Sequence, residues 1–139
     1  MSDKLNQKID IYKTYVETAQ KISEQRCKIN NVFMTFNIGL IGLQSFVSVT
    51  ILVLFAIFIN FVWISHIKTY KILNEAKFQV INIIENDLPY SPFKDEYEIL
   101  KNNQNYLCTS NERKIPIILI IFYLIGLIWY QLKEIICFC

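Results

Sequence analysis

The sequence predicts an all-α integral membrane protein, and two long apolar runs lead to that fold class. Between Val32 and Ile67 the chain has no Lys, Arg, Asp or Glu, and a second run free of these residues extends from Ile115 to Leu132. The hydrocarbon core of a bilayer is about 30 Å thick, so one membrane-spanning helix needs about 20 apolar residues. The second run therefore fits one crossing, and the first is long enough for two crossings joined by a turn.

The distribution of charge supports the same class. Charged residues make up 19% of the 139 residues, and they are gathered outside the two runs. A soluble domain would instead spread its apolar residues as stripes along each element. The net charge of +2 is small, and no basic cluster with interleaved aromatic residues occurs, so nucleic acid is not expected as a partner. The lipid bilayer is the expected surrounding.

Residues 1–31 are predicted to form a cytoplasmic amphipathic helix. Five apolar side chains recur at the 4-3-4-3 spacing of one helix face, and the spacing ends after residue 19 because Ser23 and Arg26 take the next positions. A stripe this short does not support a free-standing coiled coil. We expect it to mediate oligomerisation with a neighbouring subunit or to pack on the second cytoplasmic segment. This N-terminal stripe consists of Leu5, Ile9, Tyr12, Val16 and Ala19.

Residues 32–67 are predicted to form a transmembrane hairpin of two spans, with the turn near residues 44–48. The first span, about residues 30–43, is the weaker one because polar and small residues dilute it. The second, about residues 49–67, is strongly apolar. The alternative is a buried or re-entrant first segment followed by a single span.

Three large polar side chains interrupt this hairpin: Asn37, Gln44 and Asn60. They fit hydrogen bonding between helices, at about 0.5–2 kcal/mol each. The sharper interpretation is that they line a pore. His66 at the membrane edge has no second His and no intramembrane carboxylate beside it in the sequence, so it does not indicate a metal ligand or a proton relay.

Residues 68–114 are predicted to form a cytoplasmic helical region. Apolar residues at helical spacing indicate that the helix of the second span continues into it and ends before Pro89. Ser91 is placed to cap a second helix that begins with Pro92 and ends near Lys101.

Residues 115–132 are predicted to form a third span, followed by a short tail at 133–139. Thr109 and Glu112 have the spacing of a capping box that leads into this span. Pro116 lies inside the helical pattern, so a kink or break is expected at the membrane surface.

The basic residues predict the orientation. Residues 1–31 hold six Lys and Arg and residues 68–114 hold seven, whereas the proposed turn holds none and the tail holds only Lys133. The positive-inside rule places both basic segments, and so the N-terminus, in the cytoplasm. Two crossings must then lie between them, and a third leaves the tail outside.

The sequence offers no set of residues for catalysis. None of the four cysteines forms a C-x-x-C pair, and no catalytic triad, phosphate-binding loop, glycine-rich dinucleotide loop or metal-ligand cluster can be assembled. We therefore expect a protein that is not an enzyme, with no catalytic residues, no metal and no cofactor.

Several short segments together resemble a known family. The segments are Y-K-T-Y-V-E-T-A-Q-K-I-S-E at residues 12–24, then Asn30, Phe33 and Asn37, then L-N-E-A-K-F at 73–78, Glu85 and Leu88-Pro89, and finally Thr109, Glu112 and Ile115-Pro116. The pattern resembles the RipA family of small bacterial inner-membrane proteins. The resemblance implies a multi-pass protein of the cytoplasmic membrane that forms homo-oligomers, namely octamers, with no established biochemical activity.

Two functional hypotheses follow. The first is a structural or scaffolding membrane protein whose cytoplasmic helices assemble copies into a homo-oligomer. The second is a regulated pore or membrane-perturbing effector of a bacterial conflict system, because the chain is also similar to SLATT-type two-span domains. Other protein partners are not indicated.

Thiol labelling tests the predicted topology. In intact cells Cys27 and Cys108 should resist an impermeant thiol reagent, because both lie in predicted cytoplasmic segments, whereas reduced Cys137 or Cys139 should react. Labelling of Cys27 from outside without labelling of Cys108 would show that the long apolar run crosses only once.

Overall fold

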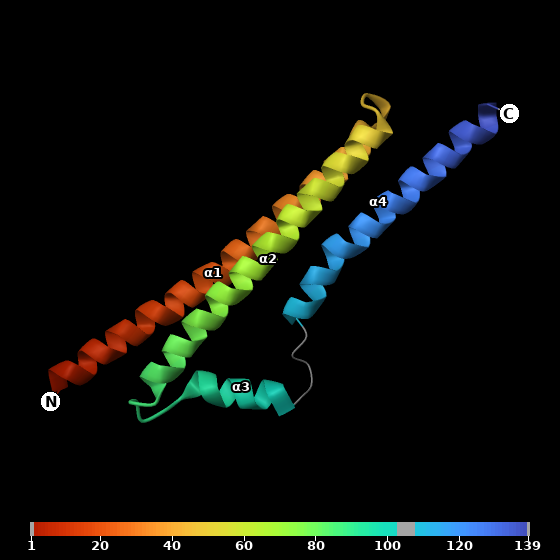
Figure 1. Cartoon of the computed structure of the whole chain (residues 1–139). Coiled ribbons are helices and arrows are strands. Elements are labelled where there is room, and N and C mark those ends of the chain that lie inside the picture. The colour runs from red at the N-terminus through yellow and green to blue at the C-terminus, as the bar shows by residue number, and fades with distance from the viewer. Residues whose placement is uncertain (1, 103–107, 139) are drawn as a thin grey trace. The chain divides into compact units, whose positions relative to one another are not determined.

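The structure is a computed structural model that describes residues 2–102 and 108–138. Within these ranges it is helical and has no strand, which confirms the all-α class (Figure 1). Its elements are α1 (Ser2–Gly42), the 3₁₀ turn η1 (Leu43–Ser45), α2 (Val49–Glu85), α3 (Pro92–Asn102) and α4 (Cys108–Phe138).

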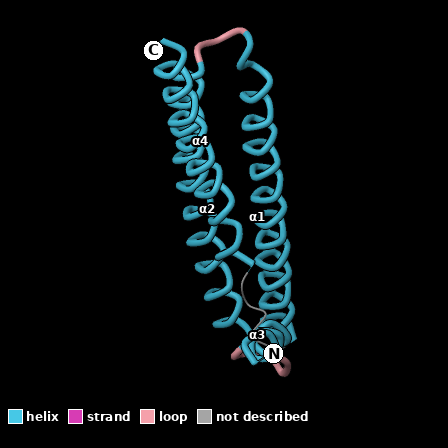
Figure 2. Tube along the Cα trace, turned by 90° about the vertical axis from the view of Figure 1, so that its right-hand side faces the viewer, coloured by secondary structure: helices cyan, strands magenta, loops and turns pink. Residues whose placement is uncertain are grey.

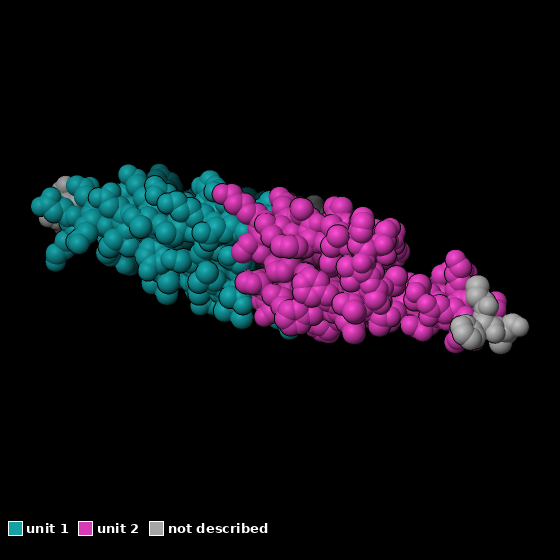
Figure 3. Space-filling model, turned by 90° about the horizontal axis from the view of Figure 1, so that it is seen from above, with its two compact units in different colours: residues 1–27, 68–109 teal, residues 28–67, 110–139 magenta. Residues whose placement is uncertain are grey.

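The chain divides into two compact units (Figure 3). Unit 1 comprises Met1–Cys27 and Lys68–Thr109, and unit 2 comprises Lys28–Ile67 and Ser110–Cys139. Helices α1 and α2 each contribute one part to either unit, whereas α3 belongs to unit 1 alone and α4 falls almost wholly in unit 2.

Unit 2 is a helical hairpin with α4 packed on it. The turn that joins α1 to α2 is drawn in pink in Figure 2. It is closed by the backbone N–H groups of Phe46 and Val47, which donate to the Leu43 carbonyl at 3.0 and 3.2 Å. The turn segment carries Gln44 and Ser45, which favour an irregular backbone over a further helical turn. The buried core of the unit consists of Leu40, Val53, Ala56 and Tyr123.

Two of the described helices contain stretches that are long and apolar enough to cross a membrane, Val49–Glu85 and Glu112–Ile136. The end of α1 does not reach this level, so the crossing at residues 30–43 stays a prediction. Asn37 and two glycines lower the hydropathy of that segment, and charged residues precede it in the same helix.

Two local expectations differ from the structure. The sequence assigns residues 1–31 to one helix and the first span to another element, but α1 is continuous over both, because no Pro or helix-ending Gly lies between them. Of the kink or break expected at Pro116, the break does not occur, since α4 is continuous through this residue. Proline removes one helical hydrogen bond. Its ring is fully buried here, and packing of this kind makes proline tolerable in apolar helices.

Unit 1 combines the first part of α1, the last part of α2 and α3. Helix α3 begins at Pro92, where the sequence predicts a helix start, because proline suits the first helical position. The side chains of Thr109 and of Cys108, Cys137 and Cys139 lie outside the described residues.

Candidate functional site

Two asparagines of the predicted hairpin form one buried contact in unit 2. The exposed fraction of Asn37 is 2% and that of Asn60 is 0%. The Asn60 Nδ2 donates to Asn37 Oδ1 at 2.8 Å and also to the Ala56 carbonyl at 2.8 Å. The Asn37 Nδ2 donates to the Phe33 carbonyl at 2.8 Å. The contact therefore joins α1 to α2 within one chain, and the two amides point at each other.

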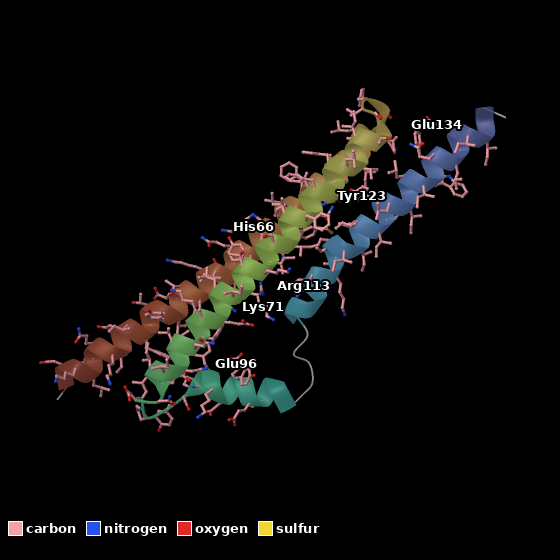
Figure 4. All side chains as sticks on the ribbon, viewed as in Figure 1. His66, Lys71, Glu96, Arg113, Tyr123 and Glu134 are labelled. Carbon is pink, nitrogen blue, oxygen red and sulfur yellow. The ribbon has the colours of Figure 1, made fainter. Side chains whose placement is uncertain are left out.

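Tyr123 brings α4 to the same place. Its hydroxyl donates to the backbone carbonyl of Asn37 at 3.2 Å, and Figure 4 shows the side chain directed from α4 towards the hairpin. Three helices therefore meet at Asn37. Sequence reasoning missed Tyr123, although one signal was present: a tyrosine inside an apolar span needs a partner for its hydroxyl when it is buried.

A second polar contact joins α1 to α2 farther along the hairpin from its turn. Trp63 is 1% exposed and its Nε1 donates to Asn30 Oδ1 at 2.8 Å. The Phe33 ring stacks on Trp63, with centroids 5.6 Å apart and planes 6° apart, and also lies 5.8 Å from the His66 ring. Trp63 is thus a buried helix contact and does not face outward as an interfacial anchor.

Gln44, the third predicted polar residue, does not join the asparagine pair. It is exposed and lines a groove of about 450 Å³ within unit 2. The groove lies between the end of α1, the start of α2 and the second half of α4. The structure thus brings two of the three predicted polar residues together and leaves the third at a cavity.

Unit 1 is organised by the buried carboxylate of Glu85, which is 1% exposed. It accepts hydrogen bonds from the Tyr12 hydroxyl at 2.9 Å and from the backbone N–H groups of Phe93 and Lys94 at 3.1 and 3.2 Å. The first N–H groups of a helix have no partner within the helix and carry partial positive charge. Glu85 therefore caps α3 from another helix. These donors are the ones that a Ser91 cap would have taken, so Ser91 does not play the predicted role.

Contact with Glu85 changes the acidity of Tyr12. Burial, the hydrogen bond to Glu85 and the negative charge of that carboxylate raise the pKa of Tyr12 to about 12. The folded state thus favours the neutral phenol. The contribution of this contact to stability is complete below pH 10, the ordinary pKa of the phenol, and is lost as the pH rises through about 12.

Aromatic and charged contacts surround Glu85 and hold the three helices of unit 1 together. Phe93 is central among them, because the Tyr12 and Phe78 rings both meet it edge to face, at 6.3 and 5.7 Å between centroids. Each of these contacts connects segments far apart in the sequence. The others are Lys77 above the Tyr15 ring at 4.8 Å and the exposed ion pair of Lys8 with Asp87 at 2.8 Å.

The N-terminal stripe is partly covered by the chain itself. Ala19 is buried, and Ile9, Tyr12 and Val16 are half-buried, while Leu5 is 45% exposed. Tyr12 of this stripe packs on Glu85 of α2 and on Phe93 of α3. No group of three or more His, Cys, Asp or Glu side chains that could hold a metal is found among the described residues.

Comparison with known proteins gives one match. A family model described as the octameric membrane protein family (8xMP) matches residues 9–132. No curated protein and no solved structure matches the chain. The matched range includes both of the polar centres described above, Asn37 with its partners and Glu85 with its partners.

A double-mutant cycle tests the Asn37–Asn60 contact. Single replacements by Leu should destabilise the fold in mild detergent, and the pair should show a coupling free energy of about 1 kcal/mol, because the second replacement removes an amide that has already lost its partner. Unfolding by added sodium dodecyl sulfate measures it. A matched cycle of Asn37 with exposed Gln44 should show no coupling. Equal coupling in both cycles would contradict the contact.

Hydrogen exchange tests the role of Glu85. Replacement by Ala leaves a buried hydroxyl and two helix N–H groups without their acceptor, which should cost about 2–4 kcal/mol of stability in unit 1. The amides of Phe93 and Lys94 should then exchange faster. Glu98→Ala changes an exposed carboxylate of the same helix and should leave that protection intact. Unchanged protection in Glu85→Ala would refute the capping.

Proposed function

The chain belongs to the octameric membrane protein family, and from this membership we propose that it self-assembles into a homo-octamer that acts as a structural scaffold in the membrane. The family match carries the proposal, and the two apolar helices support a membrane location. A structural role is proposed in place of a catalytic one. The narrower assignments also belong to the proposal: the RipA family, the bacterial inner membrane and a cytoplasmic N-terminus.

Exposed isoleucines in unit 1 support contact between subunits outside the membrane. Ile72 and Ile83 are 67% and 66% exposed, and they lie three helical turns apart on one face of α2. In the proposed orientation both follow the second span and face the cytoplasm. Exposed Glu75 and Gln79 lie between the two isoleucines on this side of the helix, so the proposed contact consists of two apolar side chains with polar side chains between them.

The exposure of these isoleucines changes which residues we expect to form the contact between subunits. Most of the N-terminal stripe is already covered by the chain itself, so only Leu5 at its start offers much free apolar surface. We therefore place the contact between copies on the α2 face of Ile72 and Ile83, with Leu5 as a secondary contributor. Assembly through cytoplasmic helices remains the proposed mode.

A pore is less well supported by the geometry. The Asn60 amide donates to Asn37 Oδ1 and to the Ala56 carbonyl, and the Asn37 amide donates to the Phe33 carbonyl, so within one chain the two side chains do not form a polar lining. A dye-leakage assay on liposomes that contain the reconstituted protein tests this. Retention of the dye would agree with a scaffold. Leakage that follows protein concentration would favour the pore.

Mass measurement in mild detergent tests the assembly. The wild-type protein should have the mass of eight copies, and the double variant Ile72→Glu/Ile83→Glu should have a smaller one because charge cannot be buried in the contact without a partner. Ile11→Glu places the same charge at an exposed isoleucine on α1 and should keep the wild-type mass. A wild-type monomer at micromolar concentration would overturn the proposal.

A further inference from the structure

Helices α1 and α4 run in the same direction through unit 2. Gln44 of the hairpin turn and Lys133 near the end of α4 line the same groove, so the second half of α4 lies beside the turn (Figure 2). The hydrogen bond from Tyr123 to the Asn37 carbonyl places these two residues at one level. Positions counted from this bond can therefore be compared between the two helices.

The cations that precede this bond lie at one level in both helices. Lys28 comes nine positions before Asn37 in α1, and Lys114 comes nine positions before Tyr123 in α4. At about 1.5 Å per residue, each cation is about 14 Å from the bond along its helix. Both side chains are exposed, as is typical of basic residues that flank a membrane span.

The charge-free length of α4 matches the thickness of the hydrocarbon core. The next charged residue after Lys114 is Lys133, which comes 19 positions later. This separation corresponds to about 29 Å, and the hydrocarbon core of a bilayer is about 30 Å thick. Tyr123 lies nine positions after the first lysine and ten before the second. The contact of Tyr123 with Asn37 is therefore at the middle of this length.

The hairpin turn lies at the opposite boundary from Lys28. Phe46 comes nine positions after Asn37, and Val49, where α2 begins, comes 11 positions before Asn60. These distances correspond to about 14 and 17 Å from the asparagine contact. With its headgroups a bilayer is about 40–45 Å thick, so it extends about 20–22 Å from its middle. The turn, with the 84% exposed ring of Phe46, therefore ends inside the headgroup layer.

The end of α1 is apolar on every side that unit 2 leaves open. In residues 31–43 only Phe33, Asn37 and Leu40 are buried or half-buried, and they lie on one helix face. The other residues carry no charge and include large exposed side chains such as Ile38, which is 67% exposed. A neighbouring copy would cover one side of this helix, whereas acyl chains can surround all of its open sides.

We propose that the bilayer surrounds unit 2 between these two levels. The contact of Asn37, Asn60 and Tyr123 then lies at the bilayer midplane, the end of α1 is in contact with acyl chains, and Phe46 holds the turn within the headgroups. This inference rests on the membrane location in the proposed function and is independent of the number of subunits.

Site-directed spin labelling of the full chain tests these depths. Each variant carries one cysteine, with the four native cysteines replaced by Ser, in vesicles of phosphatidylcholine and phosphatidylglycerol. Oxygen concentrates in the hydrocarbon core and a water-soluble nickel chelate stays outside it, so their relative contact with the label reports its depth. Ile38→Cys and Leu124→Cys each label the position after the midplane contact, and both side chains are exposed, so the fold should be retained.

The labels at Ile38→Cys and Leu124→Cys should report the same depth, near the midplane. Phe46→Cys should lie about 12 Å shallower, because it is eight positions from Ile38. It should still lose most of the contact with the nickel chelate that Tyr90→Cys shows. Tyr90 is the matched control, because it is an aromatic residue outside the helices of unit 1 and is 82% exposed.

Three results would overturn the proposal. Phe46→Cys could meet the chelate as freely as Tyr90→Cys, which would show that the turn projects into water. The labels at Ile38→Cys and Leu124→Cys could differ in depth, which would show that α1 does not cross beside α4. Exclusion of both oxygen and chelate from Ile38→Cys would assign this face to a neighbouring copy. The depths do not depend on subunit number, so a wrong octamer and a wrong depth are told apart.

Discussion

Helices surrounded by lipid gain little from contacts between apolar side chains, because the lipid tails offer the same contacts. Hydrogen bonds and close packing must then determine which helices meet and in what register. In unit 2 of this protein Asn37 makes the hydrogen bonds that join the helices. Its side chain bonds to Asn60 of α2 and its carbonyl accepts from Tyr123 of α4, while the surrounding core is aliphatic. Asn37 is thus the residue at which the three helices of unit 2 meet through hydrogen bonds.

In unit 1 a charged side chain, the buried carboxylate of Glu85, joins the helices. A buried carboxylate is tolerated only when donors surround it, and Glu85 has three, from Tyr12 and from the first turn of α3. The first turn of α3 has N–H groups without partners inside the helix, and the Glu85 carboxylate has lone pairs that accept from them. Both units therefore place a polar side chain of one helix against a backbone group of another.

The sequence predicted the helices better than the contacts between them. The apolar runs and Pro92 were sufficient for the all-α class and for the start of α3, because these signals are local. The bonds of Tyr12 to Glu85 and of Tyr123 to Asn37 join residues 73 and 86 positions apart. Helical periodicity shows which side of a helix is apolar, but it does not show which polar group will lie opposite. For the same reason Ser91 was the obvious cap in the sequence and Glu85 was not.

The contacts at Asn37 also bear on how the chain is made. Synthesis proceeds from the N-terminus, and segments can associate as they emerge. Asn37 and Asn60 are separated by 23 positions, so the hairpin can close soon after α2 has left the ribosome. Tyr123 is 86 positions away from its acceptor and arrives much later. The hairpin thus serves as the template, and α4 docks last onto a carbonyl that is already in place.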